Sequence, residues 1–329
     1  MESIALGRTK LNVTPFGLGL AALGRPGYIN LGHHDDLGAD YSIESMEARA
    51  HAVLDVAWEA GVRYFDSARS YGRAEAFLGS WLSARQHQRL TVSSKWGYTY
   101  TADWQVHAEA HEVKEHSLAV LDRQITESRE ILAEQLQLYQ IHSATLESGV
   151  LGNSEVLTRL GELKASGLRV GLSVSGANQA EVICRALGVT VDGELLFDTC
   201  QATWNVLETS AGEALREASE AGLGIIIKEG VANGRLTERN DSPAFAEKKT
   251  GLQELARRHQ VSVDAIALAG ALAQPWVDTV LSGAANGAHL QSNLTACKVT
   301  LNADELAYLA TLAESPESYW ATRGSLAWN

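Results

Sequence analysis

The sequence predicts a (β/α)8 barrel of the TIM type, on two observations. Short, almost wholly apolar runs alternate with amphipathic stretches along nearly the whole chain. Runs without polar alternation are typical of strands buried on both faces, as in parallel sheets. Eight such runs fit within the 329 residues with helical patterns between them, which is the alternation and length that this barrel requires.

Each predicted element rests on its own local pattern. The strands cover residues 15–22, 62–66, 90–95, 137–142, 168–174, 195–201, 223–228 and 278–282. Residues 45–60 are predicted to be a helix, with Ser45 as its N-cap and Gly61 as its end. Its apolar face has helical spacing and consists of Met46, Ala50, Val53, Leu54 and Ala57.

Two further helices are indicated by their boundaries. Residues 154–166 follow Asn153, precede Gly167 and carry one apolar stripe of Val156, Leu157, Leu160 and Leu163. The segment from Ser210 to Glu213 has the spacing of a capping box, so we expect a helix to start there.

An open doubly wound sheet is the alternative fold. Residues 17–22 match the loose GxGxxA pattern of dinucleotide-binding folds, and Asp40 lies near the expected acidic position. That pattern requires a helix to begin at the glycines. Here the segment 24–27, Gly-Arg-Pro-Gly, breaks the chain instead, and no helical pattern resumes until about Ser45. We therefore prefer the barrel, as a single domain over residues 1–329.

The longest irregular segments are 24–44, 96–111, 229–250 and the tail from 315. Three of the four follow a predicted strand. In a barrel such loops lie at the C-terminal face and carry the active site. The sequence thus predicts long loops around a site at that face.

Composition excludes several classes of partner and compartment. Apolar residues make up 45% and charged residues 20%, which are ordinary globular values. The net charge of −13 argues against general binding of nucleic acid or anionic membranes. Cys184, Cys200 and Cys297 are too few and too scattered for a disulfide framework. With no signal-peptide pattern and no apolar run of membrane-spanning length, we expect a cytoplasmic protein.

Four titratable residues end three successive predicted strands. Asp66 is followed five residues later by Tyr71, and Lys95 and His142 end the next two strands. Each residue alone could have a purely structural role at the end of its strand, but the strand ends of a barrel converge on one site. We expect Lys95 to favour the phenolate of Tyr71 and Asp66 to hold Lys95. Tyr71 then protonates a carbonyl oxygen, His142 orients it, and a nicotinamide supplies the reducing equivalent.

The segments FDSARSYG, SSKWG and YQIHSA resemble, in order and spacing, the three signature regions of the aldo-keto reductases. The resemblance runs from LGRTKLNVTPFGLGLAALG near the N-terminus to SGAANGAHLQSNLTA near the C-terminus. It implies a (β/α)8 barrel, a nicotinamide cofactor across its C-terminal face, and Asp66, Tyr71, Lys95 and His142 as the catalytic tetrad.

The same resemblance implies cofactor-binding residues. Ser173 and Gln201 match the ligands of the nicotinamide carboxamide, although Val174 replaces the usual asparagine. Lys228 stands where the family commonly has an aromatic residue stacked on the nicotinamide ring, so either its stem covers the ring or it is an ordinary strand-end charge. Ser282, Gly283, Gln291 and Asn293 match the adenosine end, and Arg235 or Arg239 is expected near the pyrophosphate.

The choice of cofactor stays open between NADP and NAD. The family's habit favours NADP, but no Lys or Arg occurs from Trp276 through Cys297, where a 2′-phosphate contact is usual. No metal site is predicted, because the run from His33 to Asp36 is adjacent in sequence and the histidines His111 and His116 lack HExxH spacing.

The functional reading is an oxidoreductase that interconverts an aldehyde or ketone and an alcohol, with Tyr71 as general acid or base. Aromatic walls are expected around a small carbonyl or sugar substrate, from Tyr28, His33, His34, Trp96, Tyr98, Tyr100, Trp104, Trp204, Trp320 and Trp328. Two alternatives remain: a sugar dehydrogenase working oxidatively with NAD, and a regulatory subunit that senses nicotinamide with little turnover.

Overall fold

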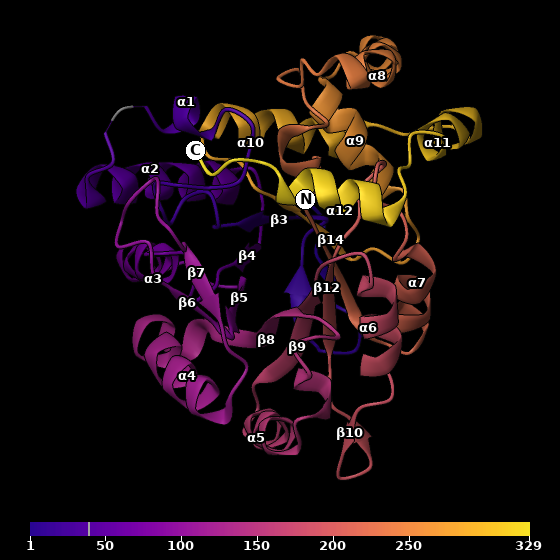
Figure 1. Cartoon of the computed structure of the whole chain (residues 1–329). Coiled ribbons are helices and arrows are strands. Elements are labelled where there is room, and N and C mark those ends of the chain that lie inside the picture. Colours follow the sequence, from indigo (N-terminus) through magenta and orange to yellow (C-terminus); the bar gives the residue numbers. More distant parts are fainter. Residues whose placement is uncertain (39) are drawn as a thin grey trace.

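The chain folds as a closed barrel of parallel strands surrounded by helices, in a computed structural model that describes residues 1–38 and 40–329 (Figure 1). The barrel strands are β3 (Phe16–Gly19), β4 (Tyr64–Asp66), β5 (Thr91–Trp96), β8 (Leu136–Ala144), β9 (Arg169–Val174), β12 (Thr199–Thr203), β13 (Gly224–Lys228) and β14 (Thr279–Ser282). Their order follows the sequence, and β14 pairs with β3 to close the ring. The predicted (β/α)8 barrel is confirmed, and each predicted strand overlaps an observed one.

Helices cover the outside of the barrel between successive strands (Figure 1). They are α2 (Ile43–Glu59), α3 (Ala74–Arg85), α4 (Leu118–Leu132), α5 (Ser154–Ala165), α6 (Gln179–Ala186), α7 (Gly212–Glu220), α8 (Ala246–His259), α9 (Val263–Leu272), α10 (Gly287–Leu294) and α11 (Ala303–Ala310). The buried face of α2 is the face predicted from the sequence. No helix in the described part of the chain is long and apolar enough to cross a bilayer.

Two predicted caps are wrong. The N-cap of α2 is Ser42, whose hydroxyl accepts from the backbone N–H of Ser45 at 3.4 Å, so the helix begins earlier than expected. No capping box opens α7, because the Ser210 hydroxyl donates to the carboxylate of Glu208 instead. At α2 a nearby serine takes the capping role, whereas at α7 the N-cap is Ala211 and no side chain caps the helix.

The amino end of the barrel is closed by a hairpin of β1 (Ile4–Ala5) and β2 (Asn12–Val13). Leu6 and Val13 pack there with barrel residues such as Leu138 and Ile226. Gly7 has φ of 50°, and a Cβ at this position would lie 2.3 Å from the backbone nitrogen of Gly224. Glycine is therefore required for the hairpin to reach the base of the barrel.

The loops at the other end contain more regular structure than the sequence predicts. Short helix α1 (His33–Leu37) lies in the first loop, and β6 (Tyr98–Tyr100) pairs with β7 (Glu112–Lys114) as a hairpin in the third. The tail forms α12 (Pro316–Gly324), drawn in yellow in Figure 1. Backbone bonds between Tyr28 and Asn329, at 3.1 and 3.2 Å, tie the end of the chain to the first loop.

A buried carboxylate fixes the segment that follows β4. Glu75, 2% exposed, accepts from Ser94 at 2.5 Å and Ser128 at 2.7 Å and forms an ion pair with Arg69. The backbone N–H of Arg69 donates to the carbonyl of Lys95 at 3.0 Å. This network therefore anchors residues 66–72 to β5 and α4.

We expect Glu75→Gln to lower the free energy of unfolding by roughly 3 kcal/mol, because it removes one partner of a buried pair. The matched control is Glu127→Gln, which removes the other, more exposed carboxylate on Arg69, 2.8 Å from the guanidinium. Its effect should stay below about 1 kcal/mol. Urea unfolding measures both, and equal effects would show that Glu75 is no anchor.

Candidate active site

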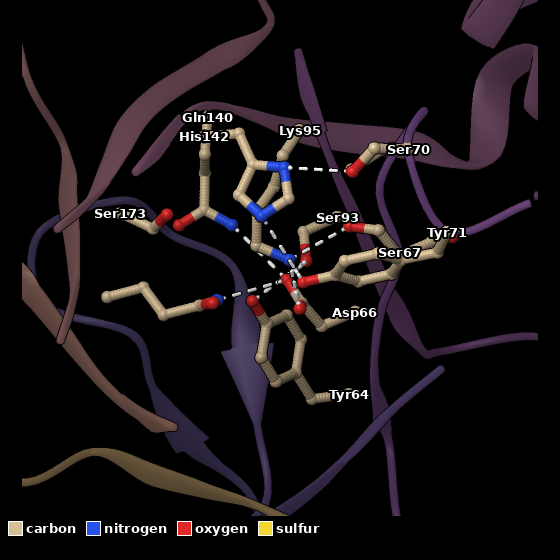
Figure 2. A network of polar contacts seen from close by, with 12 residues as sticks. Tyr64, Asp66, Ser67, Ser70, Tyr71, Ser93, Lys95, Gln140, His142 and Ser173 are labelled. Atoms are coloured by element: carbon tan, nitrogen blue, oxygen red, sulfur yellow. Dashed lines mark hydrogen bonds and ion pairs between the residues drawn. The ribbon is translucent and has the colours of Figure 1, made fainter. Parts of the chain in front are cut away.

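The carboxyl ends of β4, β5 and β8 bring the four predicted residues together. Asp66, Lys95 and His142 come from the three strands, and Tyr71 from the segment after β4. Figure 2 shows their polar groups converging within one network. A cavity of about 610 Å³ opens above them, and Asp66, Tyr71 and His142 form part of its wall.

Asp66 and Lys95 form a buried ion pair at the centre of this network. Lys95 is 0% and Asp66 2% exposed. The ammonium also donates to the carbonyl of Ser67 at 2.9 Å and lies 3.4 Å from the Tyr71 oxygen. The second carboxylate oxygen accepts from Ser93 at 2.7 Å, Gln201 at 3.1 Å and Gln140 at 3.2 Å. Both charges are thus paired and hydrogen-bonded, as burial requires.

Tyr71 and His142 face each other across the floor of the cavity. The phenol oxygen lies 3.5 Å from Nε2 of His142, and the two rings meet edge to face at 84°. The other ring nitrogen, Nδ1, lies 3.3 Å from the hydroxyl of Ser70. Ser70 therefore holds the far side of the imidazole and fixes how His142 presents Nε2 to the cavity.

Burial dominates the titration of the phenol and the imidazole. The pKa of Tyr71 is raised well above its usual value, first by burial and then by the charge of Asp66. This differs from the expectation that Lys95 would favour the phenolate, because Asp66 balances the ammonium. The pKa of His142 is lowered well below its usual range by burial and then by Lys95 and Lys228. At neutral pH the site therefore holds a protonated phenol and a neutral imidazole.

Several functional residues missed by the sequence analysis occupy one regular position. Tyr64, Ser93 and Gln140 each lie two residues before Asp66, Lys95 and His142, respectively. Side chains two apart on a strand point to the same face, so these three point into the barrel beneath the tetrad. The Tyr64 hydroxyl bonds to Ser93 at 2.8 Å, and Ser93 and Gln140 bond to Asp66. The period of a strand was the signal that identifies them.

The predicted nicotinamide-end residues differ in their access to the cavity. Gln201 lines it beside Asp66. Ser173 is 1% exposed, and its hydroxyl accepts from the backbone N–H of Ser143 at 2.8 Å. Ser143, Ser175 and Gly176 form the wall at this point. These residues present backbone and hydroxyl groups that suit a carboxamide.

Lys228 lies at the rim of the same end. Its ammonium donates to the Thr203 hydroxyl at 2.8 Å and lies 6.0 Å from the centre of the Trp320 ring. Burial lowers the pKa of Lys228 to about 8. The adjacent Glu229 pairs with Arg323 of α12 at 2.7 Å. The C-terminal helix therefore forms one wall of the cavity.

The adenosine-end residues are also divided. Ser282, Gly283 and Asn293 line the cavity, and the Asn293 amide donates to the Ser282 hydroxyl at 2.9 Å. Gln291 is exposed and does not belong to the described wall. Arg235 pairs with Glu314 at 2.6 Å and likewise does not belong to it. Arg239 and Glu238, later in the same loop, do line the cavity.

One continuous cavity thus joins the tetrad to β14 and α10. Hydroxyl and amide groups line it at both ends, and a Cβ at Gly283 would meet no atom within 4 Å. This combination of polar donors and open backbone fits a dinucleotide cofactor. Among the expected aromatic residues, Tyr28, Tyr98 and Trp320 line the cavity, while Trp96 and Trp204 are buried elsewhere.

The sequence model of the Aldo/keto reductase family matches residues 33–314. The chain belongs to the aldo/keto reductase family. It is therefore an oxidoreductase, and the family uses nicotinamide cofactors. This membership favours an enzyme over the regulatory alternative.

Individual relatives of this reductase are distant. It is 27% identical to the pyridoxal 4-dehydrogenase of Microbacterium luteolum, covering 89% of this chain and 92% of the relative. It is 22% identical to the NADH-specific methylglyoxal reductase of Escherichia coli (strain K12), covering 96% and 100%. The solved holo form of aldo-keto reductase AKR11C1 from Bacillus halodurans matches with a TM-score of 0.72 at 23% identity, over 96% of this chain and 97% of that one. The structural match supports the shared barrel.

A double-mutant cycle tests the central ion pair of this reductase. Lys95→Met leaves Asp66 as an uncompensated buried charge, and we expect it to lower the free energy of unfolding by roughly 3–5 kcal/mol. Adding Asp66→Asn removes that charge, so the double variant should be more stable than Lys95→Met alone. Urea unfolding of the four proteins measures the coupling. Simple additivity of the two single effects would contradict a direct pair.

Proposed function

We propose that this reductase interconverts an aldehyde or ketone and the corresponding alcohol, with Tyr71 as general acid in reduction and base in oxidation. The observation that carries the proposal is the place of the Tyr71 oxygen, at the cavity floor between Lys95 and His142. A phenol so placed meets the oxygen of any small carbonyl compound that enters. The experiment is replacement of this one hydroxyl, described below.

The nicotinamide supplies hydride to the carbonyl carbon when it is bound. Tyr71 gives its proton to the carbonyl oxygen as that oxygen gains charge, and its high pKa keeps the proton in place until then. Lys95, 3.4 Å away, stabilises the phenolate that remains. We assign the Ser70 hydroxyl, 3.3 Å from Nδ1 of His142, as the donor of that hydrogen bond, so that Nε2 carries the proton and can donate to the carbonyl oxygen and orient it.

The residues proposed to hold the cofactor follow from the family resemblance and the cavity wall. Gln201 and Ser173 would bind the carboxamide, Ser173 together with Ser143, to which it is hydrogen-bonded. The aliphatic stem of Lys228 would lie along the nicotinamide ring. Ser282, Gly283, Gln291 and Asn293 remain the proposed adenosine contacts. Support is strongest for those that line the cavity, namely Gln201, Lys228, Ser282, Gly283 and Asn293.

Tyr71→Phe tests the acid role. We expect kcat for a small aldehyde to fall by about 10²–10⁴-fold, the usual contribution of a positioned acid, while cofactor affinity stays within a factor of about two. Tyr308→Phe, on α11 and away from the described cavity wall, is the matched control and should keep full activity. Steady-state kinetics and quenching of tryptophan fluorescence by the cofactor provide the two readouts. Undiminished turnover in Tyr71→Phe would refute the proposed role.

The charges at the adenosine end favour NAD over NADP, against the family habit. Arg239 is bound by the carboxylate of Asp36, whose side chain is 3% exposed, and His289 lies 3.6 Å from the same carboxylate. Asp264, which forms no ion pair with a described residue, also lines this end of the cavity, as does Glu238, which lies 3.8 Å from Lys249. A 2′-phosphate would enter acidic surroundings whose nearest cation is already paired, whereas a ribose 2′-hydroxyl carries no such penalty.

Asp36→Asn releases Arg239 and should improve NADPH affinity by about 10-fold or more, the gain from one charge-assisted hydrogen bond. Affinity for NADH should change little. Asp35→Asn is the matched control, because its carboxylate forms no ion pair in the described part of the chain. Fluorescence titration of the three proteins with both cofactors measures this. Tighter binding of NADPH than of NADH by the unsubstituted enzyme would contradict the NAD preference.

An oxidative sugar dehydrogenase is the second candidate function. The acidic adenosine end supports it, because such a dehydrogenase would also use NAD. Turnover of aldoses with NAD at rates above those for aldehyde reduction would favour it over the reductive reading.

A further inference from the structure

We propose that the substrate of this reductase carries a negative group, a carboxylate or a phosphate, which binds to Lys114 while the carbonyl faces Tyr71. This inference rests on the proposed function and identifies its class of substrate. It is carried by the charges around the substrate end of the cavity and by the position of Lys114 in the ring of strands.

Most cations at this end of the cavity are already paired. Arg25, 3% exposed, forms an ion pair with Glu112 at 3.0 Å, Arg323 pairs with Glu229 at 2.7 Å, and Lys95 pairs with Asp66. Each of these pairs is formally neutral. The six charged groups of these three ion pairs therefore add no net charge to the walls of the substrate end.

Two lysines in the wall remain without a carboxylate within ion-pair distance among the described residues. They are Lys114 and Lys228, and both line the cavity. Burial lowers the pKa of each, which reflects the free-energy cost of an ammonium removed from water without a counter-ion. Glu147 and Glu229 lie near enough to offset part of this cost, but not in contact. An anionic ligand would complete the pairing.

Lys114 lies close to the catalytic groups. Its ammonium is 5.7 Å from the centre of the Tyr98 ring, and that ring is 4.8 Å from the ring of His142. The only side-chain hydrogen bond it makes to a described residue goes to the Thr145 hydroxyl, at 3.3 Å. The ammonium and the imidazole therefore both lie next to the Tyr98 ring, so we expect an aldehyde with a few carbon atoms between its carbonyl and its anionic group to reach both.

The cofactor phosphates do not account for Lys114. Thr145 directly follows β8, and β8 lies opposite β14 in the closed ring, four strands away in either direction. The proposed adenosine contacts are on β14 and α10. Lys228, on β13 beside β14, is the lysine that the cofactor can reach. Lys114 is thus assigned to the substrate.

The local charge also opposes the charge of the whole protein. The chain carries a net charge of −13. The two lysines without a carboxylate partner, Lys114 and Lys228, are therefore not the consequence of a generally basic surface. A positive site within a low-dielectric cavity attracts anions and raises their local concentration.

The test compares matched aldehydes with the holoenzyme. 4-Oxobutanoate is measured against its methyl ester, and glyceraldehyde 3-phosphate against glyceraldehyde, which separates a carboxylate from a phosphate. For one anion, we expect kcat/KM to exceed that of its neutral partner by about 10-fold or more, the value of a charge-assisted hydrogen bond. Lys114→Met should reduce this ratio towards one. The control Lys298→Met replaces an exposed lysine outside the cavity wall and should leave the ratio unchanged.

Each outcome decides the inference. Equal or lower kcat/KM for both anionic aldehydes would overturn it, while the proposed function would stand. The same ratio in Lys114→Met as in the unsubstituted enzyme would also overturn it. If no aldehyde is reduced, the proposed function fails, and calorimetric titration of the enzyme–NAD⁺ complex with butanoate and butanamide decides instead. Preferential binding of butanoate that is lost in Lys114→Met supports the anionic site, and equal binding refutes it.

Discussion

The active end of the barrel depends on the buried ion pair between Asp66 and Lys95. Neither charge is stable at that depth alone, and the pair is tolerable only because further donors and acceptors satisfy it. Those partners are Ser93, on the same strand as Lys95, Gln140 on β8 and Gln201 on β12. The requirement to satisfy one carboxylate therefore couples the alignment of four strands and fixes where the ammonium meets the Tyr71 oxygen.

The same pair explains the electrostatics of the phenol. A lysine beside a tyrosine ordinarily favours the phenolate, but here burial raises the pKa of Tyr71, and the charge of Asp66 raises it further. In the proposed mechanism, Lys95 acts when the phenol loses its proton, because the new negative charge lies 3.4 Å from the buried ammonium. The proposed mechanism thus keeps the phenol protonated at rest and stabilises the phenolate after proton transfer, which an unpaired lysine would not do.

The eight strands and the tetrad were predictable from the sequence because they depend on strong local patterns. Buried parallel strands are apolar runs, and a polar residue that ends such a run lies at the site. The hairpin of β6 and β7 was not predictable, since Val113 is exposed by 49% and its strand lacks an apolar face. Ser315 and Pro316 did signal the start of α12, as an N-cap and a first-turn proline. Nothing local indicated that Trp320 and Arg323 would reach the cavity, because tertiary contacts alone determine that.

The cavity combines opposite fields along its length, and this polarity follows from which ionic groups find partners within the chain. At the adenosine end the carboxylate of Asp36 neutralises Arg239, and Asp264 adds negative charge to the wall. At the proposed substrate end, Glu112 and Glu229 pair with arginines, and Lys114 forms no ion pair with any residue that the structure describes. A residue count cannot reveal this separation, since the chain as a whole is acidic. It arises because the closed barrel places β8 and β14 on opposite sides of one opening, so that groups distant in sequence set two different potentials within a single cavity.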